Sequence, residues 1–342
     1  GWVGGVGSLG APFPRPLCHV GCRRDRRRSH DGATVHEVEW NVVVDANRLV
    51  DRLLDASVVG GYSRLGYAVR SRSWSRPPRE ILNGCSVVVT GPTSGIGFAA
   101  SRMLRSMGAS LVLLGREPGR LDRTVETLGK AVDSDAALEP IVVDMGDLDA
   151  VARAARRVVE LGRPIHAVIH NAGALDRERA TSPQGYERTI ATHVLGPHLF
   201  SLLTLPVVNR VITVSSGGMY AAPLPDMSSG GSPEMPADRW DGTRQYATAK
   251  RVQVTLNEMW ADREAATLFA AMHPGWADTP GVRSSIPMFA KLTGPLLRTP
   301  EQGADTVVWL AAAEGIGTGR FWCDRVVRPI HRLPAKIGRA HV

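Results

Sequence analysis

Cysteine is scarce in this sequence, and its few thiols fit no metal-binding pattern. The 342 residues include four cysteines, of which Cys18 and Cys22 lie close to His19 and His30. Their spacing matches none of the usual zinc-ligand patterns, so we expect no metal site. The thiols favour a reducing compartment.

Long apolar runs and a secretory signal are also missing. No apolar run approaches the length of a membrane span, and the first residues, GWVGGVGSLGAPFPRP, lack a charged start followed by an apolar core. Hydrophobic residues make up 43% of the chain and charged residues 22%, which is typical of a soluble globular protein. We therefore expect a cytoplasmic protein.

The body of the chain has little excess of basic charge. Residues 1–80 hold 13 arginines against 8 acidic residues, whereas residues 81–342 hold 28 Lys and Arg against 25 acidic residues. Most of the net charge of +8 therefore lies in the N-terminal segment. The nearly balanced body excludes nucleic acid as an expected partner.

Four segments follow from these shifts in composition. Residues 1–44, rich in Gly, Pro and Arg, and residues 333–342 are expected to be tails. The final IGRAHV (337–342) is what a common sequencing adapter encodes, so we expect that residues 1–44 and 337–342 are not genuine coding sequence. Residues 45–80 form an arm, and residues 81–332 form the main domain.

The arm combines an amphipathic stretch with interleaved arginines and aromatic residues, in GGYSRLGYAVRSRSWSRPP. Such a segment can sit on an anionic membrane surface, which predicts a peripheral membrane contact through residues 45–76. The alternative, which we favour, is an arm packed over the main domain with its arginine stems in solvent.

The chain is organised around VVVTGPTSGIGFAA, residues 87–100. A continuous Val run predicts a buried parallel strand, and the small-residue turn after it predicts a loop that lets the backbone approach a phosphate. The next helix would point its free N–H groups at that phosphate. The cofactor-binding candidates here are Thr90, Gly91, Ser94, Gly95, Ile96 and Gly97.

Strand and helix patterns alternate from there to the end of the domain. Strands are expected at 86–90, 110–114, 140–143, 164–170, 211–214, 268–272 and 320–324, with helices at 96–107, 121–132 and 148–161 among them. This alternation predicts an α/β protein of the Rossmann type, a doubly wound seven-stranded parallel sheet with helices on both faces.

The second strand ends in Gly115-Arg116-Glu117, where selectivity for the cofactor ribose is set. An arginine there favours a 2′-phosphate, so Arg116 predicts NADP. The alternative is a solvated Arg116, with Glu117 contacting the ribose and NAD preferred. Asp144 and Met145, after the third strand, are expected to contact an adenine, and Asn171, Ala172 and Gly173, after the fourth, to pass under the cofactor.

The chain resembles the short-chain dehydrogenase/reductase superfamily over about residues 82–330. The resemblance rests on six motifs in order: TGPTSGIG (90–97), DM (144–145), NAG (171–173), VSS (214–216), YATAK (246–250) and HPGWADT (273–279). Longer phrases such as RVITVSSGGM (210–219) and DGTRQYATAKR (241–251) are similar to the dehydrogenase/reductase member 12 branch and its bacterial relatives.

The catalytic candidates are a tyrosine and a lysine four residues apart, Tyr246 and Lys250, which share a face if they lie on a helix. An ammonium group close to the phenol would stabilise the phenolate by about three pKa units. Tyr246 would then give a proton to a carbonyl oxygen, or take one from an alcohol. Ser216 would hold the substrate oxygen, while Ser215 would bond locally to the backbone.

The resemblance implies further contacts and one departure. It implies that Lys250 reaches the nicotinamide ribose, that Pro274 and Gly275 lie near the nicotinamide, and that Asp278 and Thr279 bond its carboxamide or a phosphate. The family usually carries a catalytic Asn where this chain has His193, which would either bond the same relay water or pack locally.

Two segments rich in Met and aromatic residues are expected to cover a hydrophobic substrate, with mutual packing or a subunit contact as the alternative. They hold Met219, Tyr220, Met227, Met235 and Trp240, and then Ile286, Met288, Phe289 and Leu292. The expected protein is an NADP-dependent oxidoreductase acting on a carbonyl or alcohol of a hydrophobic small molecule. A non-catalytic NADP-binding sensor or scaffold is the alternative, and homo-oligomers are compatible with either.

Overall fold

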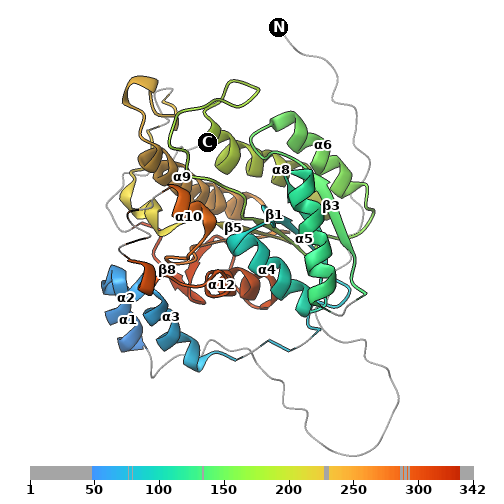
Figure 1. The fold of residues 1–342 in the computed structure, drawn as a ribbon, viewed down its shortest axis with the longest axis horizontal. Helices are drawn as coiled ribbons and strands as arrows, with labels where there is room; N and C mark the ends of the chain where they lie inside the picture. The colour runs from blue at the N-terminus through green and yellow to red at the C-terminus, as the bar shows by residue number, and fades with distance from the viewer. Residues whose placement is uncertain are drawn as a thin grey trace, which may run out of the picture.

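The described part of the chain forms one sheet with helices packed on both of its faces (Figure 1). This computed structural model describes residues 48–75, 77–78, 80–132, 135–226, 231–285, 288, 291 and 293–331. The tails expected at both ends lie outside the described residues.

The sheet has the strand order β3-β2-β1-β4-β5-β6-β7-β8. The first seven of these strands run parallel, and β8 pairs antiparallel with β7. The doubly wound α/β fold is therefore confirmed, but the expected count of seven strands was one too low. The strands are β1 (Ser86–Thr90), β2 (Ser110–Gly115), β3 (Leu138–Val142), β4 (Ala167–His170), β5 (Arg210–Val214), β6 (Leu268–Met272), β7 (Arg320–Cys323) and β8 (Val326–Arg328).

Three helices cover each face of the sheet. One face carries α4, α5 and α12, and the other carries α6, α8 and α9. The helices are α1 (Arg48–Ala56), α2 (Val58–Tyr62), α3 (Arg64–Arg70), α4 (Gly95–Ser106), α5 (Pro118–Ala131), α6 (Leu148–Val159), α7 (Arg188–Ile190), α8 (Gly196–Thr204), α9 (Gly242–Arg263), α10 (Pro280–Ser285) and α12 (Pro300–Ala312). Shorter turns of helix are η1 (Ser71–Ser73), η2 (Ala191–Leu195), η3 (Leu205–Val207), η4 (Gly217–Ala221), η5 (Ala237–Arg239) and η6 (Gly294–Leu296).

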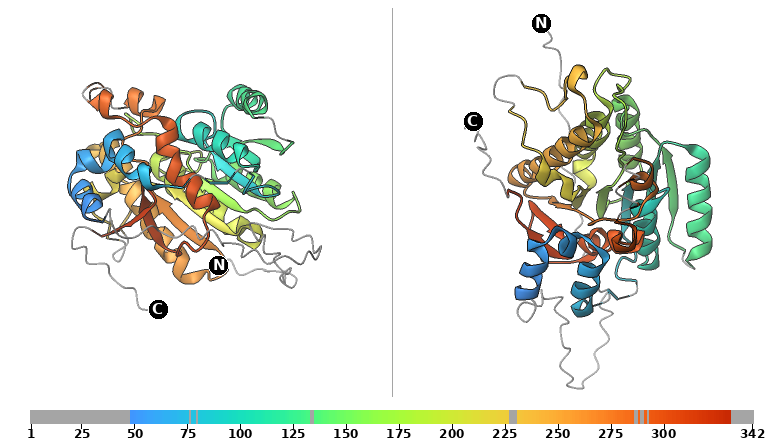
Figure 2. Two further views of the ribbon diagram at one scale, coloured as in Figure 1. Left: turned by 90° about the horizontal axis from the view of Figure 1, so that it is seen from below. Right: turned by 60° about the vertical axis from the view of Figure 1, so that its left-hand side comes forward.

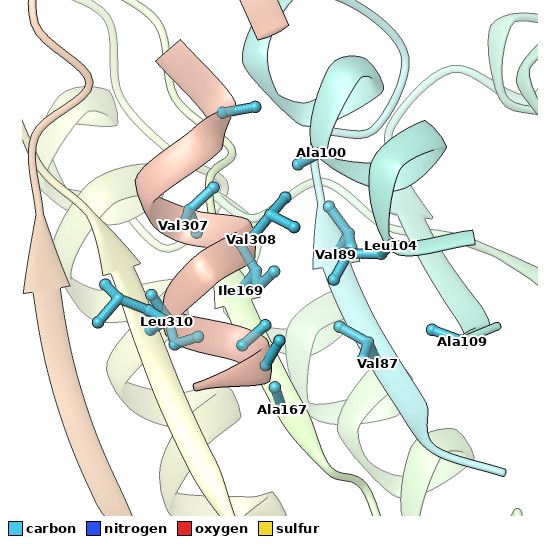
Figure 3. Packing of buried hydrophobic residues seen from close by; sticks show 14 of the residues in the cluster. Val87, Val89, Ala100, Leu104, Ala109, Ala167, Ile169, Val307, Val308 and Leu310 are labelled. Carbon is cyan, nitrogen blue, oxygen red and sulfur yellow. The ribbon is translucent and has the colours of Figure 1, made fainter. Parts of the chain in front are cut away.

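The Val run of β1 serves both faces because successive strand side chains point to opposite sides. Val87 and Val89 pack among residues of α4 and α12, as Figure 3 shows, whereas Val88 packs among residues of α6 and α8. All five β1 residues are buried. A strand that is covered on both faces can be apolar throughout, so the continuous Val run indicated a buried parallel strand.

The expected boundaries differ from the observed ones by a few residues. The helix expected at 96–107 is α4, one residue earlier at both ends, while α5 begins three residues before the expected 121 because Pro118 occupies its first position. The strand expected at 164–170 begins only at Ala167.

The expectation about apolar run length needs correction. One helical segment, Arg188–Val207, is long and apolar enough by composition to cross a membrane. Half of it is buried inside the fold, between α6 and α9, as expected for a core helix.

The arm lies beside the β7–β8 end of the sheet, where Figures 1 and 2 show α1, α2 and α3 in blue. Its arginines do not all extend into solvent as expected. Arg64 is exposed, but Arg70 is buried and pairs with Asp51 and Asp324. Leu53 of α1, an apolar side chain in this stretch, is 64% exposed.

Candidate active site

The glycine-rich turn after β1 is folded tightly against the end of β4. A Cβ on Gly97 would lie 2.1 Å from the Gly91 carbonyl oxygen and 2.4 Å from Asn171 Nδ2. Gly91 has a φ of +66° and would meet Ala172. These positions therefore need glycine, and the turn presents backbone where a side chain would otherwise stand.

Hydrogen bonds between two strand ends fix this turn. The Thr90 hydroxyl accepts from the backbone N–H groups of Asn171 (3.0 Å) and Ala172 (2.9 Å). The Asn171 side-chain amide donates to the carbonyls of Thr90 and Gly91. Thr90 and Asn171 thus hold β1 and β4 in register at their carboxyl ends.

Helix α4 begins directly after this turn. Its N-cap, Ser94, is extended and makes no side-chain capping bond. Gly95 has a φ of +53°, and a Cβ there would lie 3.1 Å from the Thr279 side chain. Ile96 packs toward Gly303 of α12. The structure therefore brings Ser94, Gly95 and Thr279 together, while Ile96 turns toward a helix.

The end of β2 is more open. The Arg116 side chain is 65% exposed, and its Nε lies 3.7 Å from Glu117 Oε1. A pocket of about 250 Å³ opens beside the glycine-rich turn, and Arg120 and Arg123 of α5 line it. These two arginines were not among the expected site residues, although Arg120 lies four residues after Arg116 and so could have been suspected.

The two candidate adenine residues have different surroundings. Asp144 accepts a hydrogen bond from the Gly146 backbone, a local turn of the kind that short acidic side chains favour. Met145 is 4% exposed and packs in the core under β1 and β2. Its side chain is therefore engaged in packing, which the sequence did not predict.

The two serines after β5 have separate partners. The Ser215 hydroxyl donates to the Lys250 carbonyl at 2.9 Å, so it bonds the backbone, but that of α9, 35 residues away, and not a local one as expected. The Ser216 hydroxyl accepts from the Gly218 backbone N–H at 3.1 Å and lies beside the Tyr246 side chain, on which it acts to lower the pKa. Ser216 and Tyr246, from β5 and α9, thus place two hydroxyl groups together at the carboxyl end of the sheet.

Burial governs the charge of Tyr246 and Lys250. It raises the pKa of Tyr246 above its usual value, an effect that the neighbouring Ser216 hydroxyl partly offsets. Burial lowers the pKa of Lys250 to about 7. The Lys250 ammonium donates to the Val214 carbonyl at 2.9 Å and lies 5.4 Å from the centre of the Tyr246 ring. Desolvation is the largest effect on Tyr246 here, and the expected lowering of its pKa by Lys250 stays a prediction.

His193 lies in the π-helical turn η2, against the tyrosine. Its ring meets that of Tyr246 edge-on with centroids 5.4 Å apart, and its Nε2 bonds the Ala174 backbone, 2.9 Å from the carbonyl oxygen. Burial, and then Lys250, lower the pKa of His193 to about 3. The imidazole is thus neutral and locally packed. A Cβ on Gly173 would collide with it at 2.3 Å, so glycine makes room for this ring.

The turn after β6 lies against Arg298 and the arm. Gly275 has a φ of +73°, and a Cβ there would meet the Arg298 guanidinium at 2.5 Å and the Tyr62 carbonyl at 2.7 Å. The Trp276 N–H donates to the same Tyr62 carbonyl at 2.8 Å. The arm therefore packs directly against the turn after β6, a contact that the sequence did not reveal.

For two residues of the expected covering segments the structure shows the alternative, packing within the fold. Met219 is fully buried among Val254, Ala271 and Phe321, and Tyr220 packs on Phe321, so these side chains pack within the fold. Met288 is 68% exposed. Met227, Ile286, Phe289 and Leu292 lie outside the described residues.

In the part of the chain that the structure describes, no group of three or more His, Cys, Asp or Glu residues could hold a metal ion. The site is instead one of hydroxyl, amine and backbone groups around a glycine-rich turn. Such a set can position a phosphate-bearing cofactor and exchange a proton with a substrate oxygen.

Comparison with known proteins agrees with this geometry. A family model described as short chain dehydrogenase matches residues 86–225. Dehydrogenase/reductase SDR family member 12 of Bos taurus is 35% identical over 79% of this chain and 86% of the relative. Polyprenol dehydrogenase of Mus musculus is 30% identical over 72% of this chain and 77% of the relative. A solved 3-oxoacyl (acyl-carrier-protein) reductase from Agrobacterium tumefaciens C58 is similar in fold, with a TM-score of 0.56 and 20% identity over 70% of this chain and 92% of that one.

Proposed function

This chain belongs to the short-chain dehydrogenase/reductase family and is an NAD(P)-dependent oxidoreductase, and from that premise we propose that it uses NADP to reduce a carbonyl of a hydrophobic small molecule, or to oxidise the alcohol. The observation that carries the proposal is the placement of the Ser216 side chain beside Tyr246, with Lys250 Nζ 5.4 Å from the centre of the tyrosine ring, at the edge of the sheet where such folds bind ligands.

The residues present fit a nicotinamide dinucleotide. The turn from Gly91 to Gly97 offers backbone N–H groups without side chains in the way, at the start of α4. Thr279 lies over Gly95, and Asn171 holds the turn in shape. These groups would hold the pyrophosphate, while Pro274 and Gly275 would lie near the nicotinamide end.

The preference for NADP rests on positive charge near the ribose position. Arg116 is exposed at the end of β2, and Arg120 and Arg123 line the pocket beside the glycine-rich turn. A guanidinium matches the geometry and charge of a phosphate group. Glu117, close to both Arg116 and Arg120, is the residue that would favour NAD instead.

When bound, the reduced nicotinamide supplies hydride. In the reductive direction Tyr246 gives its hydroxyl proton to the substrate oxygen as the carbonyl carbon gains hydride, and the product is the alcohol. Burial helps by keeping Tyr246 protonated until that moment. The Ser216 hydroxyl holds the same oxygen. Lys250 orients the cofactor ribose and, with a pKa near 7, is suited to pass a proton back toward Tyr246.

A hydrophobic substrate is favoured by the aromatic residues next to the site and by the name of one relative, polyprenol dehydrogenase. Tyr62 and Trp276 lie at the turn after β6 with their ring centroids 6.2 Å apart. Peripheral membrane contact is a further proposal, supported by the apolar side chains that the arm exposes: Leu53, Val59, Leu65 and Val69.

The proposal is tested by following cofactor consumption with NADPH and NADH over a panel of apolar ketones and aldehydes. We expect turnover with NADPH preferred, and we expect Arg116→Ala to raise the KM for NADPH about tenfold while that for NADH changes little. Arg157→Ala is the matched control, since Arg157 is also exposed and beside a glutamate but lies on α6. Tight NADPH binding without turnover of any member of the panel would favour the sensor or scaffold alternative.

A further inference from the structure

Tyr62, at the end of α2 in the arm, lies at the candidate active site itself. We propose that its ring forms one wall of the substrate site, so that the N-terminal arm sets the size of the substrate. This inference rests on the proposed function and deepens it. The arm lies outside the segment matched by the family model and more than 150 residues before Ser216.

The position of the ring follows from its contact with Gly217. A Cβ on Gly217 would lie 2.7 Å from Cε2 of Tyr62, so the ring lies directly over the residue that follows Ser216. On its other side the Tyr62 ring meets the His273 ring edge-on at 4.6 Å, and His273 begins the turn at Pro274. Tyr62 therefore spans from the serine to the turn after β6, and it is only half-buried.

The backbone around Tyr62 is anchored to the main domain. The Tyr62 carbonyl accepts from the Trp276 N–H, and the carbonyls of Gly61 and Ser63 accept from the Arg298 guanidinium at 3.0 and 3.2 Å. Arg298 also donates to the Pro274 carbonyl. One buried side chain thus binds both the residues flanking Tyr62 and the turn that Tyr62 packs against.

Buried ion pairs fix the rest of the arm. Asp324 binds Arg298 and Arg70 at distances of 2.6 to 2.8 Å, and Asp51 of α1 binds Arg70 and Arg328. Burial alone would raise the pKa of Asp324, but the two arginines hold it below its usual value, so this carboxylate stays charged. A wall held in this way is rigid, which is what selection by size requires.

The first test measures size selectivity. The ratio of kcat/KM for a two-ring ketone, decalone, to that for cyclohexanone should rise about tenfold in Tyr62→Ala, because removing a wall admits the larger ring system. Tyr62→Phe keeps the wall and should leave the ratio within about twofold. Tyr67→Ala is the matched control, since Tyr67 lies in the same arm but packs on Trp74 and Arg298. An unchanged ratio in a folded Tyr62→Ala protein overturns the inference.

The second test uses the contact with Gly217. Gly217→Ala should lower kcat/KM, and combining it with Tyr62→Ala should restore part of the loss, because the added methyl no longer meets the ring. A loss that is the same with and without the Tyr62 ring contradicts the inference.

A binding experiment separates failure of the proposed function from failure of this inference. If the wild-type protein turns over neither ketone, the affinities of decalone and cyclohexanone for the NADP⁺-loaded protein are measured by calorimetry in the same variants. A rise in relative affinity for decalone in Tyr62→Ala, absent in Tyr62→Phe, supports the wall even without turnover. Absence of such a rise, or no binding of either ketone, overturns it.

Discussion

The residues of the candidate site are controlled more by burial than by attraction between charges. Tyr246 keeps its proton and Lys250 has a pKa of about 7, although the two side chains share one face of α9. Lys250 Nζ lies 5.4 Å from the centre of the tyrosine ring and bonds to the Val214 carbonyl. At this position it does not offset the rise in the tyrosine pKa that desolvation causes. Near neutral pH this geometry favours a protonated Tyr246 beside a Lys250 that is divided between its charged and neutral forms.

His193 provides a prediction about stability. Its pKa is about 3 in the folded protein and near 6.5 when unfolded, so the unfolded state binds the extra proton at acidic pH. The folded protein therefore loses stability as the pH falls below about 6.5. Relative to His193→Asn, which cannot titrate, the wild type should lose about 2 kcal/mol of unfolding free energy between pH 7 and pH 5. Urea unfolding at both pH values measures this difference, and parallel losses in the two proteins would show that the histidine is not buried neutral.

Sequence reasoning identified which residues meet at the site better than it identified their states. The spacing of Tyr246 and Lys250 and the position of Ser216 after a strand were enough to expect them together, because helix period and the alternation of strands and helices can be read from local sequence. The carbonyl partner of Lys250 and the fit of His193 against Gly173 depend on packing between distant elements. Their catalytic roles stay predictions.

At the scale of elements, the glycine-rich turn and the β7–β8 hairpin show what local sequence can and cannot indicate. The turn carries its own signal, since glycines at fixed spacing follow a Val strand. The hairpin carries no such signal. Its two turn residues, Asp324 and Arg325, both have a positive φ, and turns of this kind usually have the sequence Asn-Gly, which is absent here. Strand β8, three residues long, was missed for this reason.

Gly97 of this turn should tolerate no side chain. In Gly97→Ala the new methyl would meet the Gly91 carbonyl and Asn171, so the turn must open and the affinity for NADPH should fall at least about a hundredfold. Gly129→Ala on α5 is the control, because its Cβ would meet nothing within 4 Å and alanine favours a helix. NADPH fluorescence titration compares the two proteins. Unchanged affinity in Gly97→Ala would argue against a cofactor at this turn.

At the scale of the whole molecule, the arm and the C-terminal hairpin are joined by a buried charge network. Asp51 and Arg328 are 277 positions apart in the chain, yet their side chains meet at 2.7 Å. Nothing in either local sequence specifies such a partner, so the place on the main domain where the arm packs could not be predicted. Arg70 of the arm, expected in solvent, instead joins α1, α2 and the turn between β7 and β8.

Removing one member of this charge network should destabilise the folded protein. Arg298→Met leaves Asp324 buried with one fewer partner and should lower the free energy of unfolding by about 3 to 5 kcal/mol. Arg102→Met, which removes a largely exposed ion pair with Glu301, should cost about 1 kcal/mol or less. Urea denaturation of both variants at neutral pH gives the comparison. Similar small losses would mean that the arm is only loosely attached.

The central claim is that Tyr246 exchanges the proton with the substrate, and one comparison tests it most directly. The kcat/KM of Tyr246→Phe is measured with NADPH and the best carbonyl substrate, alongside the NADPH dissociation constant and the control Tyr186→Phe, which changes a tyrosine that is 43% exposed. The account predicts a loss of at least about a hundredfold in kcat/KM for Tyr246→Phe, with NADPH affinity little changed and Tyr186→Phe unaffected. A Tyr246→Phe protein that retains most of its turnover would contradict it.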